Sequence, residues 1–65
     1  MRQLYLTTNI KYLKRIGIKI SKNIAKAAMN KKLPQLDDLI SFSNDSGISI
    51  NDFLFEDIEQ KNKLS

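Results

Sequence analysis

Eight polar residues between positions 19 and 32 have types and spacing that suit contact with a polyanion. They are Lys19, Ser21, Lys22, Asn23, Lys26, Asn30, Lys31 and Lys32. Lysine neutralises phosphate charge, and asparagine and lysine at a helix start can hydrogen bond to adenine and guanine edges. The stretch therefore predicts contact with double-stranded DNA, without distinguishing contacts to bases from contacts to phosphates. The alternative is that these side chains form an ordinary solvated face.

Basic and acidic residues are segregated along the chain. Residues 1–32 include nine basic residues and no acidic one, whereas residues 33–60 hold all seven acidic residues and no basic one. With Lys61 and Lys63 counted, the two halves carry +9 and −5, which sums to the net charge of +4. We expect a strongly dipolar molecule whose basic half meets a polyanion while the acidic half is held away from it.

The composition argues against an enzyme or a metalloprotein. The chain has no cysteine and no histidine, so disulfides, the usual zinc sites and histidine-based catalysis are excluded. Gly17 and Gly47 are the only glycines, which leaves no glycine-rich phosphate loop. Asp37 and Asp38 have no partner in the sequence that would complete an acid–base site. We expect no catalytic residue, no cofactor and no metal.

Length and hydropathy indicate one small domain. Sixty-five residues bury only about 60% of their unfolded surface, so such a domain is marginal unless it is helical or oligomeric. No apolar run approaches the roughly 20 residues of a membrane span, and the N-terminus lacks the apolar core of a secretory signal. We expect a cytoplasmic protein with one domain over residues 1–60 and a flexible tail over residues 61–65.

The periodicity predicts an all-α fold of about four short helices. Leu6, Ile10 and Leu13 indicate a first helix over residues 8–16, with Thr7 or Thr8 as N-cap. Gly17 is its natural end, and residues 16–21 then form a short extended link. The alternative is one continuous helix to residue 30, because the later isoleucines fall on the same helical stripe as the apolar residues of the first helix. We favour two helices with a break between them.

A second helix is predicted from Ser21 to about Asn30. Ser21 is its N-cap, and Ile24, Ala27 and Ala28 give it a narrow apolar face. The side chains that point away from this apolar face are those of Lys22, Asn23, Lys26 and Asn30. Pro34 cannot continue this helix.

A third helix is predicted to open at Pro34. It carries an apolar stripe of Leu36, Leu39, Ile40 and Ser43, with Asp37 and Asp38 in its first turn. The charge switch at Pro34 thus puts cations in the last turn of one helix and anions in the first turn of the next.

The last helix has the clearest boundary signals. Gly47 suits a left-handed turn, Ser49 and Asp52 suit a reciprocal cap, and Ile48 and Phe53 have the spacing of a hydrophobic staple. This helix is expected over residues 50–58, with Phe53, Leu54 and Ile58 in the core. The aromatic residues are assigned to the core, because they are not interleaved with cations as a single-strand platform requires. They are Tyr5, Tyr12, Phe42, Phe53 and Phe55.

Two segments resemble Cro/repressor-type (Xre-like) helix-turn-helix proteins. "TNIKYLKR" resembles their first helix, and "NIAKAAMNKKLPQLDDLISFSNDSGISINDFLFEDI" resembles the recognition helix and the two helices after it. The resemblance implies a lambda-repressor-like helical bundle, but about ten residues that usually resemble Ser-Gln-x-x-Leu-Ala-x-x-Leu-Gly are absent. The second, positioning helix is therefore expected to be missing or fused into its neighbours, which leaves the DNA-binding pair of helices incomplete.

We consider first a small transcriptional regulator of a phage or mobile element, with the helix from Ser21 in the major groove. Lys11, Lys14 and Arg15 would join Lys31 and Lys32 in neutralising the DNA backbone. The alternative is a protein-binding modulator, an antirepressor or corepressor that pairs with a repressor, or a remnant without function. Apolar residues in excess of what four short helices can bury support that partner; the alternatives are ordinary core packing and a homodimer. They are Leu4, Tyr5, Leu6, Ile16 and Ile18.

Overall fold

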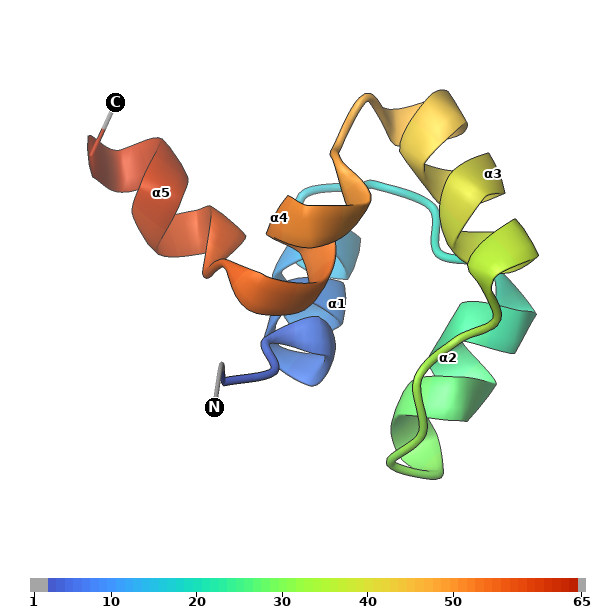
Figure 1. Cartoon of the computed structure of the whole chain (residues 1–65). Coiled ribbons are helices and arrows are strands. Elements are labelled where there is room, and N and C mark those ends of the chain that lie inside the picture. Colours follow the sequence, from blue (N-terminus) through green and yellow to red (C-terminus); the bar gives the residue numbers. More distant parts are fainter. Residues whose placement is uncertain (1–2, 65) are drawn as a thin grey trace.

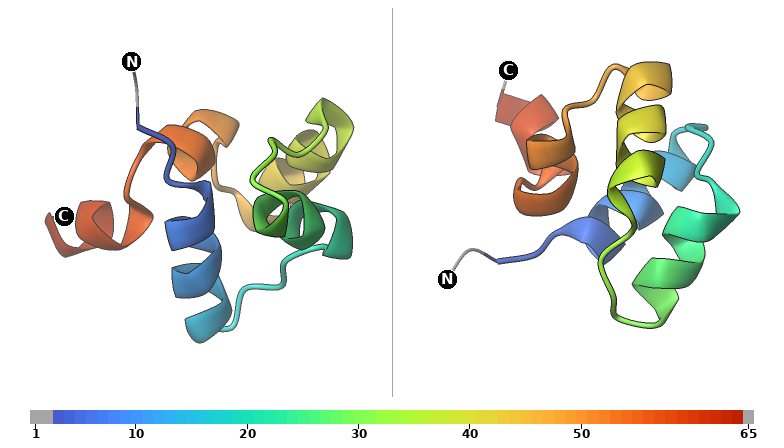
Figure 2. Two further views of the ribbon diagram at one scale, coloured as in Figure 1. Left: turned by 90° about the horizontal axis from the view of Figure 1, so that it is seen from below. Right: turned by 45° about the vertical axis from the view of Figure 1, so that its right-hand side comes forward.

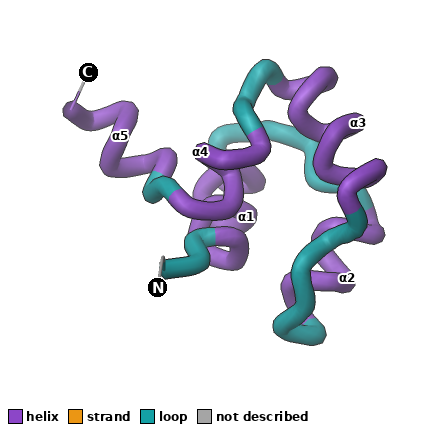
Figure 3. Tube along the Cα trace, viewed as in Figure 1, coloured by secondary structure: helices purple, strands orange, loops and turns teal. Residues whose placement is uncertain are grey.

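The computed structural model describes residues 3–64, which form five α-helices and no strand. The helices are α1 (Leu6–Arg15), α2 (Lys22–Met29), α3 (Leu36–Ser46), α4 (Ile50–Phe55) and α5 (Ile58–Leu64). Figure 1 shows α1 and α4 at the centre, α2 and α3 on one side, and α5 on the other. The loops that connect them are short (Figure 3). The expected all-α class is confirmed, with one helix more than predicted.

α1 begins at Leu6, two residues earlier than expected. Its N-cap is Tyr5, which makes no side-chain cap bond, so the assignment of Thr7 or Thr8 as N-cap is wrong. A tertiary contact explains the early start, because the Tyr5 amide donates to the Leu54 carbonyl of α4 at 2.7 Å. Gly17 ends the helix as predicted, in a left-handed conformation with φ of 89°.

The predicted break between the first two helices is confirmed. Residues 18–21 are not helical, and the Ile18 amide donates to the Leu13 carbonyl at 2.8 Å. Ser21 is the N-cap of α2 as expected, since its hydroxyl oxygen accepts from the Ile24 amide at 3.2 Å. The chain leaves α2 through Lys31, a non-glycine residue with φ of 58°.

α3 differs from its prediction at its start and on its buried face. Pro34 is buried but lies before the helix, whose N-cap is Gln35. Asp37 and Asp38 occupy the first turn as predicted, whereas Lys31 and Lys32 lie beyond the last turn of α2, where Lys26 is the only cation.

The apolar stripe predicted for α3 is only partly correct. Leu39 is buried, but Leu36 is 63% and Ile40 43% exposed, and Phe42 takes their place in the core. The cause is packing against α4, because the Phe42 ring lies against the Phe53 ring with centroids 4.4 Å apart.

The predicted last helix is divided into two. Gly47, with φ of 77°, and Ser49, whose hydroxyl accepts from the Asp52 amide at 3.1 Å, take their predicted roles. The reciprocal bond expected from Asp52 is not formed, because its carboxylate accepts from Lys61 Nζ at 3.0 Å. α4 ends at Phe55, and residues 61–64, expected in a flexible tail, are helical as part of α5.

Asn9 explains the division between α4 and α5. Its side chain is fully buried; Nδ2 donates to the carbonyls of Phe53 and Glu56, each at 2.7 Å, and Oδ1 accepts from the Ile58 amide at 3.1 Å. These bonds satisfy backbone groups that the end of one helix and the start of the next would otherwise leave unpaired. No local pattern predicts this role, because the partners of Asn9 lie 44 to 49 residues away in the chain.

Nine buried apolar side chains form one core. They are Leu6, Ile10, Leu13, Ile24, Leu39, Phe42, Phe53, Leu54 and Ile58. The aromatic assignment is confirmed for Phe42 and Phe53, whereas Tyr5, Tyr12 and Phe55 are only half-buried. Among residues 3–64, no helix has the length and hydropathy that crossing a membrane requires.

Candidate nucleic-acid interface on α2

Lys22 and Lys26 form an exposed basic ridge on α2. They are one helical turn apart, so they lie on the same side of the helix. Their orientation is set by Ile24, which is fully buried in the core and is the only buried residue of α2. With Ile24 turned inward and Ser21 holding the first turn, the two lysines must face solvent, and both are exposed.

Four of the eight predicted contact residues border one depression beside this ridge. Asn23 and Lys26 line it from α2, Asn30 from the C-cap of α2, and Lys32 from the turn that follows. Their spacing of three and four residues within α2 explains why one side of the helix carries all three. Lys31 does not border the depression, and Lys22 lies on the ridge beside it.

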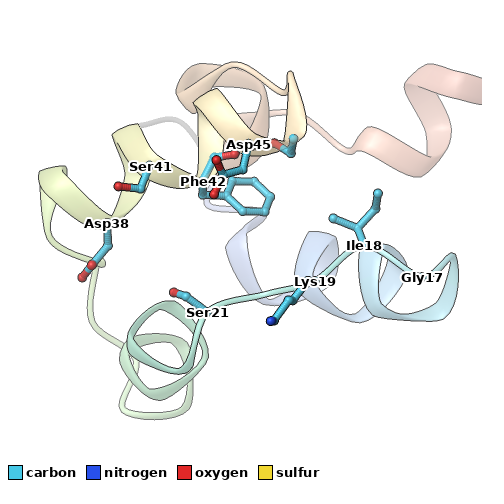
Figure 4. A pocket seen from close by; sticks show the side chains of 9 residues that line it. Gly17, Ile18, Lys19, Ser21, Asp38, Ser41, Phe42 and Asp45 are labelled. Atoms are coloured by element: carbon cyan, nitrogen blue, oxygen red, sulfur yellow. Dashed lines mark hydrogen bonds between the residues drawn. The ribbon is translucent and has the colours of Figure 1, made fainter.

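Lys19 and Ser21 border a different depression, between the α1–α2 link and α3. Figure 4 shows them across from Asp38, Ser41 and Asp45 of α3. Lys19 is exposed on the link, and the Ser21 hydroxyl is already used in capping α2. These two predicted residues are separate from the four that meet at the first depression.

The acidic residues lie closer to the basic ones than the charge pattern suggested. Asp37 and Asp38 line the same depression as Lys26 and Lys32, so these two aspartates lie beside the predicted contact residues. The expectation that the acidic half is held away from a polyanion stays a prediction. The signal that was missed is the short turn over residues 30–35, because consecutive helices joined so closely pack side by side.

The ion pairs are confined to one side of the molecule. Within residues 3–64 the ion pairs are Arg15–Glu59, Lys61–Asp52 and Lys63–Glu59, all of which involve α5. Arg15, a predicted phosphate contact, is therefore turned toward α5, and its guanidinium also lies 5.7 Å from the centre of the Tyr12 ring. No lysine between positions 19 and 32 is within 4 Å of a carboxylate oxygen in this part of the chain.

The chain has no significant match among family models, curated proteins or solved structures. The resemblance to Xre-like proteins therefore stays a prediction. Residues 16–21, which connect α1 to α2, contain no helix, so α1 directly precedes α2 in the chain.

Proposed function

We propose that this chain is a small transcriptional regulator that contacts duplex DNA through α2 and the turn after it. The observation that carries the proposal is the exposed ridge of Lys22 and Lys26, followed by Lys31 and Lys32, with none of the four in an ion pair within residues 3–64. Such unpaired cations can replace the counterions condensed on the phosphates. An α-helix also has the right diameter for the major groove.

The surroundings of the ridge restrict how α2 can approach DNA. Asp37 and Asp38 border the depression on the α3 side, where they would repel phosphates. α2 therefore meets the duplex through the side that carries Lys22 and Lys26, with α3 tilted away. In this orientation Asn23 and Asn30 lie at the edge of the contact, where their amides can hydrogen bond to bases or phosphates.

The test is a titration of a labelled duplex of about 20 base pairs, two helical turns, followed by fluorescence anisotropy. With four phosphate contacts, affinity should fall about 100-fold between ~50 and ~200 mM salt. The variant with both Lys22→Ala and Lys26→Ala should bind at least ~10-fold more weakly at ~50 mM salt, and its salt slope should fall by about 2.

The matched control removes two lysines from α5, by Lys61→Ala and Lys63→Ala. α5 lies at the opposite end of the molecule from α2 (Figures 1 and 2), so the net charge changes equally while the ridge is intact. This control should retain most of the affinity. Equal losses in the two double variants, or no binding of any duplex at ~50 mM salt, would overturn the proposal.

A second candidate function is a protein-binding modulator that pairs with a repressor. It is favoured by an apolar strip of Leu33, Leu36 and Ile40, which are 60%, 63% and 43% exposed. Leu36 and Ile40 are one turn apart on α3, and neighbouring exposed apolar side chains commonly mark protein interfaces. Of the apolar residues predicted to be surplus, Leu4 and Ile16 are about half exposed. The prediction is wrong for Leu6, which is buried in the core, and Tyr5 and Ile18 are half-buried.

Salt and substitution separate the two functions. A protein complex that buries the strip should hardly respond to salt, and Leu36→Ser with Ile40→Ser should abolish it while leaving DNA affinity unchanged. DNA binding that is lost in this variant, with α-helical circular dichroism retained, would instead assign the strip to the DNA-binding surface.

A further inference from the structure

The exposed side of α3 carries an acidic stripe parallel to the length of the helix. Asp37, Ser41 and Asp45 repeat every four residues, and all three are exposed. Asp38 lies next to them and is half-buried, because it borders both depressions. None of the three aspartates forms an ion pair within residues 3–64.

The acidic stripe borders two neighbouring depressions, which share Asp38. Asn23, Lys26 and Asn30 of α2 face Asp37 and Asp38 of α3 across one depression. The link before α2 and the later part of α3 face each other across the other (Figure 4). The acidic stripe on α3 therefore lies near basic residues of α2 and of the link before it, without forming an ion pair with them within residues 3–64.

We propose that this face is a self-association surface, on which a second copy of the chain docks by two-fold symmetry. A two-fold interface requires a patch that is complementary to itself. When the axis lies in the plane of the contact, between the ridge and the stripe, the basic ridge of each copy lies on the acidic stripe of the other, and each ion pair occurs twice.

The chemistry of the face makes the complex weak and sensitive to salt. Exposed ion pairs contribute little individually and are screened at high ionic strength. Leu36 of the apolar strip is turned away from Asp45 by helical periodicity, whereas Ile40, three residues after Asp37, borders the acidic stripe. Docking would cover Lys22 and Lys26, so if the proposed function holds, self-association and DNA binding exclude each other.

Sedimentation equilibrium tests the proposal. At ~25 mM salt the chain should form a dimer whose dissociation constant rises at least ~10-fold at ~300 mM salt. Reversing the ridge with Lys22→Glu and Lys26→Glu should give a monomer, and reversing the stripe with Asp37→Lys and Asp45→Lys should do the same. An equimolar mixture of these two variants should form a heterodimer, because opposite charges again meet at both contacts.

Leu36→Ser is the matched control and should leave the association constant unchanged. Circular dichroism of each variant checks that the helices are retained, and the salt dependence of the unsubstituted chain tests the proposal without any substitution. A monomer at ~25 mM salt and millimolar concentration, or an association that survives both reversals, would overturn it. DNA titrations at nanomolar chain concentration remain independent of this outcome, because a weak dimer is dissociated there.

Discussion

The two sides of this small molecule are held in different ways. α1, α4 and α5 are joined by polar contacts: the Tyr5 amide binds the Leu54 carbonyl, Asn9 binds the α4–α5 junction, and Arg15 pairs with Glu59. α2 and α3 have no hydrogen bond or ion pair between them within residues 3–64. They are held by apolar packing alone, through Ile24, Leu39 and Phe42.

The charged side chains have different uses on the two sides of the molecule. On the α1–α4–α5 side, polar and charged side chains are used to fix helices against one another. On the α2–α3 side the charged side chains carry no such structural role, so they are available to a partner. The division is consistent with both proposals, because a surface that binds DNA or a second copy needs charges that are not already neutralised internally.

Replacing Asn9 should have the largest effect on stability. Asn9→Leu would leave the Phe53 and Glu56 carbonyls and the Ile58 amide buried without partners, at a cost of about 3–5 kcal/mol. A chain of this size has about 3–10 kcal/mol in total, so most of its stability would be lost. Urea unfolding followed by circular dichroism measures this. Thr8→Ala, on the exposed side of α1, is the control, and a loss below ~1 kcal/mol for Asn9→Leu would contradict the role of Asn9.

Shortening Ile24 should have a smaller and more local effect. Ile24→Ala removes the only fully buried side chain of α2 and should cost about 2–4 kcal/mol. Because α2 has no polar bond to α3, its amides should lose hydrogen-exchange protection before those of α1 and α5. Equal loss of protection at the Ala28 and Ile58 amides would show that the two sides unfold as one unit.

Replacing Lys31 should have the smallest effect on stability, and it should stabilise the chain. Lys31 has φ of 58°, and its amide donates to the Ala28 carbonyl while the Lys32 amide donates to the Ala27 carbonyl, a helix-ending turn that favours glycine. Lys31→Gly should therefore raise the free energy of unfolding by up to ~1 kcal/mol. If Lys31 also contacts a phosphate, the salt slope of DNA binding should fall by about 1. Lower stability in this variant would show that the lysine side chain has a structural contact.

Much of the fold follows from local signals. Gly17 and Gly47 supply left-handed turns, and Ser21 and Ser49 cap helices, because these roles depend on the residue and its immediate neighbours. In the predicted site, Asn23, Lys26 and Asn30 lie on one side of the helix, and this follows from helical spacing alone. The position of Asp37 and Asp38 beside Lys26 does not, because it depends on how α3 packs against α2.

The amino-acid sequence by itself determined the all-α class, the helix ends at glycine and serine, and the unequal distribution of charge. Only the tertiary structure decided that Asn9 divides the last helix in two, that α3 buries Phe42 and leaves Leu36 exposed, and that opposite charges border one groove. The physical reason is that caps and turns are satisfied within a few residues. A buried amide, a pair of stacked rings and the rotation of a helix each depend on partners distant in the chain.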